Sequence, residues 1–443
     1  MPANKIDKIL KPVERFMHNE STAGILLLFS ALAAILLANS PWSAAYHHLW
    51  EYEIAIRVAH YEISNSLHHW INDGLMAMFF FVVGLELKRE MIAGELSDLK
   101  KAALPLVAAL GGMIFPALIY VLFNPTGAEN NGWGIPMATD IAFALGIISL
   151  LGKRVPLSLK IFLTALAIAD DLGAVLVIAF FYTSHISMVS LAIGVGFIAL
   201  LLTANAIGIR STLFYGILGI GGVWLAFLMS GVHATIAGVI AALAIPARTK
   251  IDEQKFVQSL EVKLREFHAI PPNDVTLLEP DQYQVIEKIY RLTKAAGTPL
   301  QRLESQLHPC VAFLIMPLFA LANAGVELNT DIFSSIFNNT VSLGVLLGLF
   351  VGKFLGVVIF TWAMIKFKIA VLPNGMNWNH LFGVGFLAGV GFTMSLFITT
   401  LAFDDSQLIT DAKIGIFLAS IISGSMGYFV LKKASATPRP LEL

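Results

Sequence analysis

The sequence predicts an all-α polytopic membrane protein with one transmembrane domain over residues 1–443. Hydrophobic residues make up 57% of the chain and charged residues only 13%, whereas soluble domains hold about 25% charged residues. In addition, twelve apolar stretches are each about long enough to cross a bilayer as a helix. They cover residues 22–39, 71–87, 102–123, 134–151, 158–182, 188–208, 213–229, 231–247, 309–326, 341–365, 380–402 and 409–430.

Lysine and arginine indicate the orientation of these spans. If the N-terminus is cytoplasmic, 26 of the 29 Lys and Arg residues fall on the inner side, as the positive-inside rule requires. Arg57 and Lys413 fall outside, and Lys353 lies within a span. We therefore expect both termini in the cytoplasm, as segments 1–21 and 431–443.

Two longer segments lie between the predicted spans. Residues 40–70 face outside, and YEIAIRV (52–58) alternates like a strand, so a small hairpin at the membrane surface is expected. Residues 248–307 form a polar cytoplasmic segment with helix-like runs such as QVIEKIYRL. A solvated linker with amphipathic helices is favoured there over an independent domain.

The fourth and eleventh spans are unsuited to being plain helices. GIPMATDIAFALG (134–146) contains Pro136, which lacks a backbone donor, and Thr139-Asp140, which can cap a new helix. GVGFLAGVGFTMS (383–395) has four glycines within nine residues. Spans three to five and ten to twelve have opposite topology, so we expect an inverted repeat with two discontinuous, crossing helices. The alternative is that the glycines only permit close helix packing.

The fifth span carries two adjacent acids, Asp170 and Asp171, within ALAIADDLGAVLVIAFF. An ionised carboxylate in a bilayer costs at least ~2.5 kcal/mol, and its default interpretation is an ion, proton or substrate site. A polar contact between helices is the alternative. Successive helical residues point about 100° apart. One aspartate is therefore expected to face an ion path while the other makes a pair.

Lys353 is the natural partner for such an acid. It lies about twelve residues from either end of its span, roughly 18 Å at helical rise, which is too deep for snorkelling. A water-filled cavity without a partner is the alternative. Asp140 is suited to facing the positive N-termini of broken helices. Coupled carboxylates can hold protons or a hard cation, and competition between the two is sufficient for exchange transport.

Seven motifs in order give the chain a family resemblance. They are INDGLMAMFFFVVGLELKRE (71–90), GIPMATDIAFALG (134–146), LAIADDLGA (166–174), SGVHATIAG (230–238), PLFALANAG (317–325), VGKFLG (351–356) and AGVGFTMS (388–395). With these motifs the sequence resembles the NhaA family of bacterial sodium/proton antiporters over about residues 18–430.

The resemblance implies a role for each matching residue at the candidate site. Asp171 would be the principal cation ligand, with Na⁺ or Li⁺ held at Asp171 and Asp170. Asp170 would share in proton exchange and pair with Lys353, and Thr139 and Asp140 would lie beside them.

A second group would set the response to pH. The resemblance places in it Glu86, Arg89, Glu90, Glu304 and His308. Ser305 stands where the family often has another histidine, so the pH setting of this chain is open. His233 matches a histidine that affects the pH response, although a lone histidine in an apolar helix is more often structural. Asp73 matches an acidic residue with no assigned role.

The resemblance also implies an activity and a location. It implies electrogenic export of Na⁺ or Li⁺ for more than one H⁺, activated as pH rises, serving sodium and pH homeostasis. The protein would lie in the bacterial inner membrane, within the lipid bilayer, as a homodimer bridged by residues 40–70. No cofactor and no nucleic-acid partner are expected.

The sequence gives less support to other functions. An intramembrane aspartyl protease would show G-x-G-D, and the sequence has none; it also lacks a phosphate-binding glycine loop, a metal cluster and a nucleophile triad, so no enzyme is expected. A channel filter is missing as well. A sodium-coupled symporter remains the alternative, with GFTMS (391–395) as the nearest group for an organic solute. The single cysteine, Cys310, excludes an internal disulfide.

Overall fold

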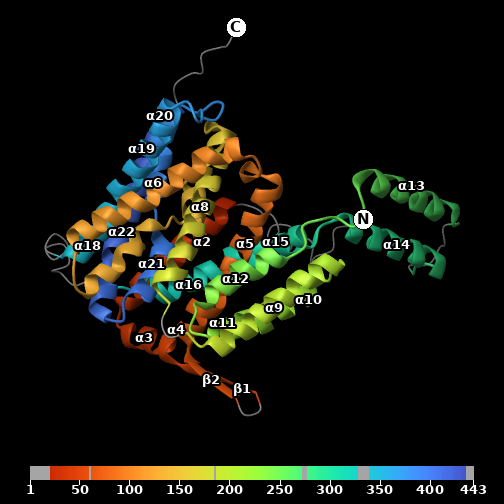
Figure 1. The fold of residues 1–443 in the computed structure, drawn as a ribbon, viewed down its shortest axis with the longest axis horizontal. Coiled ribbons are helices and arrows are strands. Elements are labelled where there is room, and N and C mark those ends of the chain that lie inside the picture. The colour runs from red at the N-terminus through yellow and green to blue at the C-terminus, as the bar shows by residue number, and fades with distance from the viewer. Residues whose placement is uncertain (1–19, 59–60, 184–185, 272–276, 328–338, 436–443) are drawn as a thin grey trace, which may run out of the picture.

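The computed structural model is a bundle of helices with two small appendages (Figure 1). It describes residues 20–58, 61–183, 186–271, 277–327 and 339–435. The predicted N-terminal segment 1–21 lies outside the described residues except for its last two, and so do residues 436–443 of the predicted C-terminal tail.

The described elements follow one another in chain order. The first half contains α2 (Glu20–Ala38), α3 (Ser43–Glu51), β1 (Glu53–Val58), β2 (Tyr61–Ser66), α4 (Leu67–His69), η1 (Trp70–Leu75), α5 (Met76–Ala93), η2 (Glu95–Ser97), α6 (Leu99–Phe123), η3 (Ala128–Met137), α7 (Ile141–Leu151), η4 (Gly152–Arg154), α8 (Leu157–Phe181) and α9 (Met188–Ile207). The second half contains α10 (Thr212–Gly216), η5 (Ile217–Trp224), α11 (Leu225–Leu228), α12 (Ala234–Ala244), α13 (Glu253–Ala269), α14 (Pro280–Ala296), α15 (Pro299–Cys310), η6 (Val311–Ile315), α16 (Met316–Asn323), α18 (Thr340–Leu347), η7 (Gly348–Gly352), α19 (Lys353–Lys366), α20 (Trp378–Ala388), α21 (Phe392–Ala402) and α22 (Ser406–Ala434).

Helix length and composition support a polytopic membrane protein. Within the described residues, nine helices are long and apolar enough to cross a membrane, or ten if Thr22–Ala38 and Ser43–Glu51, bent by 114°, form one span. Two shorter apolar helices cover Thr212–Leu228 and Ala234–Ala244. The all-α class is therefore confirmed, while the number of twelve spans stays a prediction.

The segment after α3 forms a two-stranded antiparallel hairpin. Glu53 lies opposite Ser66 and Val58 opposite Tyr61. The indole nitrogen of Trp70 donates a hydrogen bond to Ile54 O at 3.0 Å, which ties the hairpin to the start of the next helix. The alternation in YEIAIRV thus does correspond to a strand, and Figure 1 shows the hairpin projecting from the bundle.

The polar segment after α12 forms a second appendage, the pair α13 and α14 (Figure 1). Asp252 caps α13 by accepting from Lys255 N, and Glu279 and Gln282 form a capping box on α14. Lys250 N donates to Ala295 O at 3.0 Å, so the two ends of the appendage lie together.

The helix after this appendage begins earlier than the apolar stretch at 309–326 indicates. Thr298 caps it by accepting from Gln301 N, and Pro299 occupies the first turn. One continuous helix then covers Pro299–Asn323. The last residues of the predicted polar segment 248–307 therefore belong to a candidate span.

Two helical runs are interrupted, and their interruptions touch. Between η3 and α7, residues Ala138 and Asp140 are extended. Between α20 and α21 the chain leaves the helix at 389–391. Asp140 N donates to Val390 O at 2.7 Å across the two breaks, so two segments about 250 residues apart meet at their interruptions.

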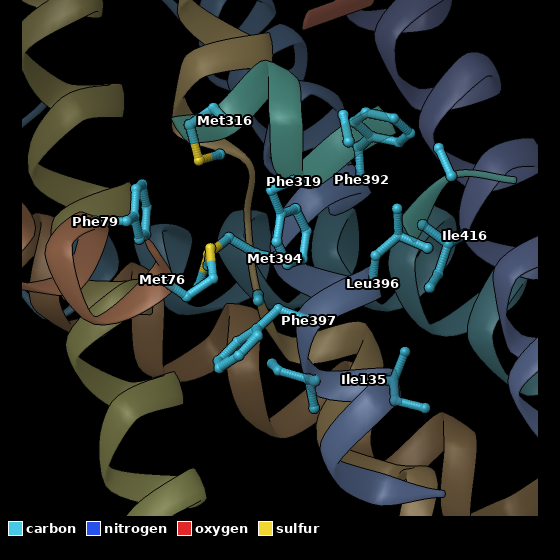
Figure 2. Close-up of a cluster of buried hydrophobic side chains, with 14 of the residues drawn as sticks. Met76, Phe79, Ile135, Met316, Phe319, Phe392, Met394, Leu396, Phe397 and Ile416 are labelled. Atoms are coloured by element: carbon cyan, nitrogen blue, oxygen red, sulfur yellow. The ribbon is translucent and has the colours of Figure 1, made fainter. Parts of the chain in front are cut away.

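An aromatic cluster holds α21 against the opposite helices (Figure 2). Phe397 lies 5.6 Å from Phe80 and 6.3 Å from Phe319 between ring centroids. Met76 and Met394 fill the space beside them. Tilted and edge-on rings at such distances attract, so the cluster fixes the position of the interrupted helix.

The helices α6 and α19 approach closely through glycine. A Cβ atom placed on Gly356 would come within 2.0 Å of Gly111 O, and one on Gly111 within 2.4 Å of Gly356 O. Small residues at such crossings allow backbones to touch in a membrane. This crossing brings Lys353, one turn before Gly356, beside α6.

Candidate functional site

Asp140 joins the two interruptions through its side chain. As the N-cap of α7, its Oδ1 accepts from Phe143 N at 2.9 Å. Its Oδ2 accepts from Thr393 N at 3.0 Å and from Thr393 Oγ1 at 2.5 Å. The carboxylate thus accepts from amide donors that have no intrahelical acceptor at the first turns of both α7 and α21, where the helix dipoles favour negative charge.

Thr139 connects this crossing to the acidic pair. Its Oγ1 lies 2.7 Å from Asp170 Oδ2 and 2.8 Å from Ala388 O. A hydroxyl has a single proton, so it donates to one of these oxygens at a time. Thr139 is completely buried, which makes this proton a link between the end of α20 and the carboxylate of α8.

Asp170 and Lys353 form a completely buried ion pair. Lys353 Nζ lies 2.5 Å from Asp170 Oδ2, and both side chains have no exposed surface. Lys353 begins α19 immediately after the π-helical turn η7, and Gly112 of α6 leaves space beside its methylene groups. Such a pair is costly to form, and removing one partner costs about 3–5 kcal/mol.

Asp171 lies beside this pair with fewer partners. It is 1% exposed, and within the described residues its Oδ1 has no hydrogen-bond donor; the same holds for Asp170 Oδ1. Buried polar atoms in proteins are nearly always satisfied by protein, water or an ion. One oxygen on each of these two carboxylates is therefore available to a proton or to a cation.

The described residues contain no group of three or more His, Cys, Asp or Glu arranged to hold a metal ion. A cation at Asp170 and Asp171 would therefore complete its coordination with backbone carbonyl, hydroxyl or water oxygens. Small hard cations accept such mixed oxygen ligands. Such a ligand set is better suited to a cation that binds and dissociates than to a cation that is bound permanently.

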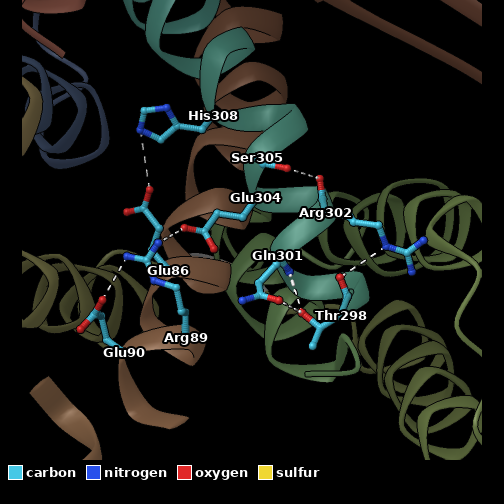
Figure 3. A network of polar contacts seen from close by, with 9 residues as sticks. All are labelled: Glu86, Arg89, Glu90, Thr298, Gln301, Arg302, Glu304, Ser305 and His308. Carbon is cyan, nitrogen blue, oxygen red and sulfur yellow. Dashed lines mark hydrogen bonds and ion pairs between the residues drawn. The ribbon is translucent and has the colours of Figure 1, made fainter. Parts of the chain in front are cut away.

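Five of the six residues predicted for the pH response, all except His233, lie together where α5 meets α15 (Figure 3). Arg89 pairs with Glu304 through Nη1 and with Glu90 through Nη2, the latter at 3.0 Å. His308 Nε2 lies 4.0 Å from Glu86 Oε1. Ser305 donates to Arg302 O and takes no part in the acidic contacts.

The remaining predicted residues lie apart from these two groups. His233 occupies the N-cap position of α12 without a side-chain bond to that helix, and its Nε2 lies 2.6 Å from Tyr182 O. Asp73 contacts His69 at 2.9 Å, one turn earlier in the chain.

Two contacts of the site region were not predicted from the sequence. Thr393, which donates to Asp140, lies in the segment GVGFLAGVGFTMS, which was predicted to interrupt a helix, but no partner was predicted for this threonine. Lys88 donates to Leu243 O at 2.6 Å and to Ile245 O at 2.5 Å, at the end of α12. A cation at a helix C-terminus is favourable. Both contacts nevertheless join residues more than 150 positions apart, so the sequence alone does not show that they meet.

Comparison with known proteins identifies the family. The sequence pattern of the family described as Na⁺/H⁺ antiporter 1 matches residues 14–431. A Na⁺/H⁺ antiporter NhaA of Oleidesulfovibrio alaskensis is 50% identical over 428 residues, covering 96% of this chain and 95% of that protein. The chain belongs to the NhaA family.

Other NhaA relatives agree over nearly the whole length. A Na⁺/H⁺ antiporter NhaA 2 of Syntrophotalea carbinolica is 45% identical over 98% of both chains. A Na⁺/H⁺ antiporter NhaA of Acidithiobacillus ferrooxidans is 48% identical over 96% of this chain and 98% of that protein. The resemblance seen in the motifs is confirmed. NhaA proteins are transporters, so the expectation that the chain is not an enzyme is also confirmed.

Proposed function

We propose that the chain exports Na⁺ or Li⁺ in exchange for H⁺ as an electrogenic, pH-activated antiporter, with proton and cation competing for Asp171 and Asp170. The observation that carries the proposal is the pair of unsatisfied carboxylate oxygens beside the buried Lys353–Asp170 contact. The relatives' names, which describe Na⁺/H⁺ antiporters, support the same exchange.

The charges of the three groups account for an electrogenic cycle. In the proton-loaded site, Asp171 is protonated and the Lys353 ammonium neutralises Asp170, so the net charge is zero. When a cation binds both carboxylates, Asp171 releases its proton, and Lys353 loses its carboxylate partner and then its own proton. Two protons leave as one monovalent cation binds, and the loaded site carries one negative charge.

Alternating access would act through the two touching interruptions. We propose that they are the breaks of discontinuous helices in an inverted repeat, spans four and eleven of twelve. In support, Asp140 bonds both breaks, and Thr139 carries the contact on to Asp170. Binding of a cation to Asp170 competes for the oxygen that Thr139 contacts, which changes the bonding between the end of α20 and α8.

The group at α5 and α15 would adjust activity to pH. Arg89 is shared between Glu90 and Glu304, and His308 faces Glu86. Histidine changes charge near neutral pH, and α5 also packs against α8, which carries the aspartates. A change in this charge network can therefore reach the cation site through one helix.

The remaining parts of the proposal concern location and partners. The chain would lie in the bacterial inner membrane with both termini cytoplasmic, in accordance with the Lys and Arg distribution. The partners would be lipid, Na⁺, Li⁺, H⁺ and a second copy joined at the β1–β2 hairpin. Transport would require no cofactor.

The test uses proteoliposomes that are more acidic inside than outside and that contain a pH-sensitive dye. Between about pH 6.5 and about pH 8.5, Na⁺ or Li⁺ should collapse the gradient for the natural sequence, and more strongly toward alkaline pH. Asp171→Asn should abolish the response, whereas the distant Asp281→Asn should retain it. Full exchange by Asp171→Asn would contradict the role of the pair, and no response of the natural sequence to either cation would favour a symporter.

A further inference from the structure

A cavity of about 540 Å³ lies away from the cation site, among α6, α8 and the loop after α19. Three lysines line it, Lys100, Lys101 and Lys368, and all three are exposed. Glu95 is the one carboxylate among its lining residues. The cavity therefore carries a net positive charge that a monoanion or dianion would complement.

The other half of the cavity is apolar and extends along the spans. Leu104, Ile161, Phe162 and Ala165 line it. Ala165 is eight residues from the start of α8 at Leu157, which is about 12 Å at helical rise. A small soluble anion such as phosphate would leave this apolar depth unfilled.

The loop that closes the cavity has the character of a membrane interface. In FKIAV (367–371), Phe367, Ile369 and Val371 are exposed by 71%, 60% and 81%. Lys368 between them has a φ of 59°, unusual for a residue other than glycine. Lys368, Ile369 and Val371 all line the cavity and are all exposed, at the level where α6 begins and α19 ends.

We propose that this cavity binds an anionic phospholipid of the adjacent leaflet, with the lipid phosphate at Lys100, Lys101 and Lys368. One acyl chain would lie along Leu104, Ile161 and Phe162. With the orientation proposed above, the leaflet is the cytoplasmic one. Amphipathic lipids match both halves of the cavity at once, whereas a soluble phosphate matches only the lysines.

Native mass spectrometry of the full chain in detergent tests the proposal, with phosphatidylglycerol and phosphatidylcholine of identical acyl chains as probes. We expect preferential binding of phosphatidylglycerol. The triple variant Lys100→Gln/Lys101→Gln/Lys368→Gln should bind it about 100-fold more weakly, because each lysine near an anionic headgroup contributes about fivefold. The matched control Lys288→Gln/Lys294→Gln/Lys433→Gln removes three exposed lysines that do not line the cavity, and it should bind normally.

Two further arms separate a lipid from a soluble anion and from a folding defect. Ile161→Trp fills the apolar half and keeps all three lysines, so it should weaken phosphatidylglycerol binding while the melting temperature is retained. Glycerol 3-phosphate should not displace the lipid. Equal binding of the two lipids, an unaffected triple variant, or displacement by glycerol 3-phosphate would each overturn the proposal. The readout is lipid binding, so its failure leaves the proposed ion exchange untouched.

Discussion

Lys353 Nζ lies 2.5 Å from Asp170 Oδ2, and neither side chain has any exposed surface. The nearest alternative acid, Asp171, is adjacent in sequence but about 100° away around α8. Lys353 therefore neutralises one aspartate of the pair and leaves Asp171 to bind a proton or a cation. The contact links the stability of the protein to the state of its ion site.

The first prediction concerns this pair. Lys353→Ala leaves the Asp170 carboxylate buried without its cation, and we expect a loss of about 3–5 kcal/mol in the free energy of unfolding. The double variant Lys353→Met/Asp170→Asn removes both charges and should recover most of that loss while exchange stays absent. Thermal unfolding in detergent measures the stability, and a dye assay in proteoliposomes measures the exchange.

Lys433→Ala, an exposed lysine at the end of α22, is the control for this experiment. It should change the unfolding free energy by less than about 0.5 kcal/mol. If Lys353→Ala were as stable as this control, the contact with Asp170 would contribute nothing to the fold.

A second prediction concerns Asp140, whose carboxylate accepts bonds from both interruptions. Asp140→Ala leaves Phe143 N and Thr393 N without their acceptor, so we expect at least about 2 kcal/mol of destabilisation. Thr393→Val removes only the hydroxyl bond and keeps Thr393 N bonded to Asp140, so it should cost about 1 kcal/mol. Thermal unfolding measures both variants. If Asp140→Ala and Thr393→Val lost the same stability, the amide bonds to Asp140 would contribute nothing measurable.

A third prediction concerns the crossing of α6 and α19. Gly356→Val places side-chain carbon against Gly111 O and should separate the two helices. We expect a large loss of folded protein and of exchange, because Lys353 lies on the same helix. Gly196→Ala in α9, where a Cβ would meet no atom within 4 Å, is the matched control and should fold normally. Normal exchange by Gly356→Val would contradict the close approach.

Physical rules applied to the sequence identify the charged residues of this site, but they do not identify the residues with which these pair. Asp170, Asp171 and Lys353 stand out because charge is costly in an apolar helix. Pro136 and the Thr139-Asp140 cap indicate where helix α7 begins. These signals are local, so the residues could be selected without knowledge of the tertiary structure.

Contacts between distant segments could not be selected in this way. Thr393 bonds Asp140 from 253 positions away, and that pairing depends on how α7 and α21 pack. The residues alone showed that Lys353 needs an acid but could not choose between Asp170 and Asp171, because the rotation of α8 decides it. The early start at Pro299, in contrast, has a local signal in Thr298-Pro299, which a search for apolar stretches overlooks.

The last prediction concerns the charge network of α5 and α15. Glu304→Gln removes one of the two carboxylates that share Arg89, so Arg89 should pair more firmly with Glu90. His308→Gln replaces the imidazole, whose Nε2 lies 4.0 Å from Glu86 Oε1, with a side chain that carries no charge at any pH. Each change should move the pH at which exchange is half-activated by about 0.5 units or more, while the maximal rate is largely retained.

A direction is expected for His308→Gln. The variant has no group beside Glu86 that can become positively charged, so activation should occur at a lower pH than in the natural sequence. Ser305→Ala is the matched control on the same helix, since Ser305 contacts only Arg302 O within this group. Exchange measured across the pH range should give the control an unchanged midpoint. An unchanged midpoint in both substituted proteins, with Arg89 and Glu90 intact, would assign the network to folding rather than to pH control.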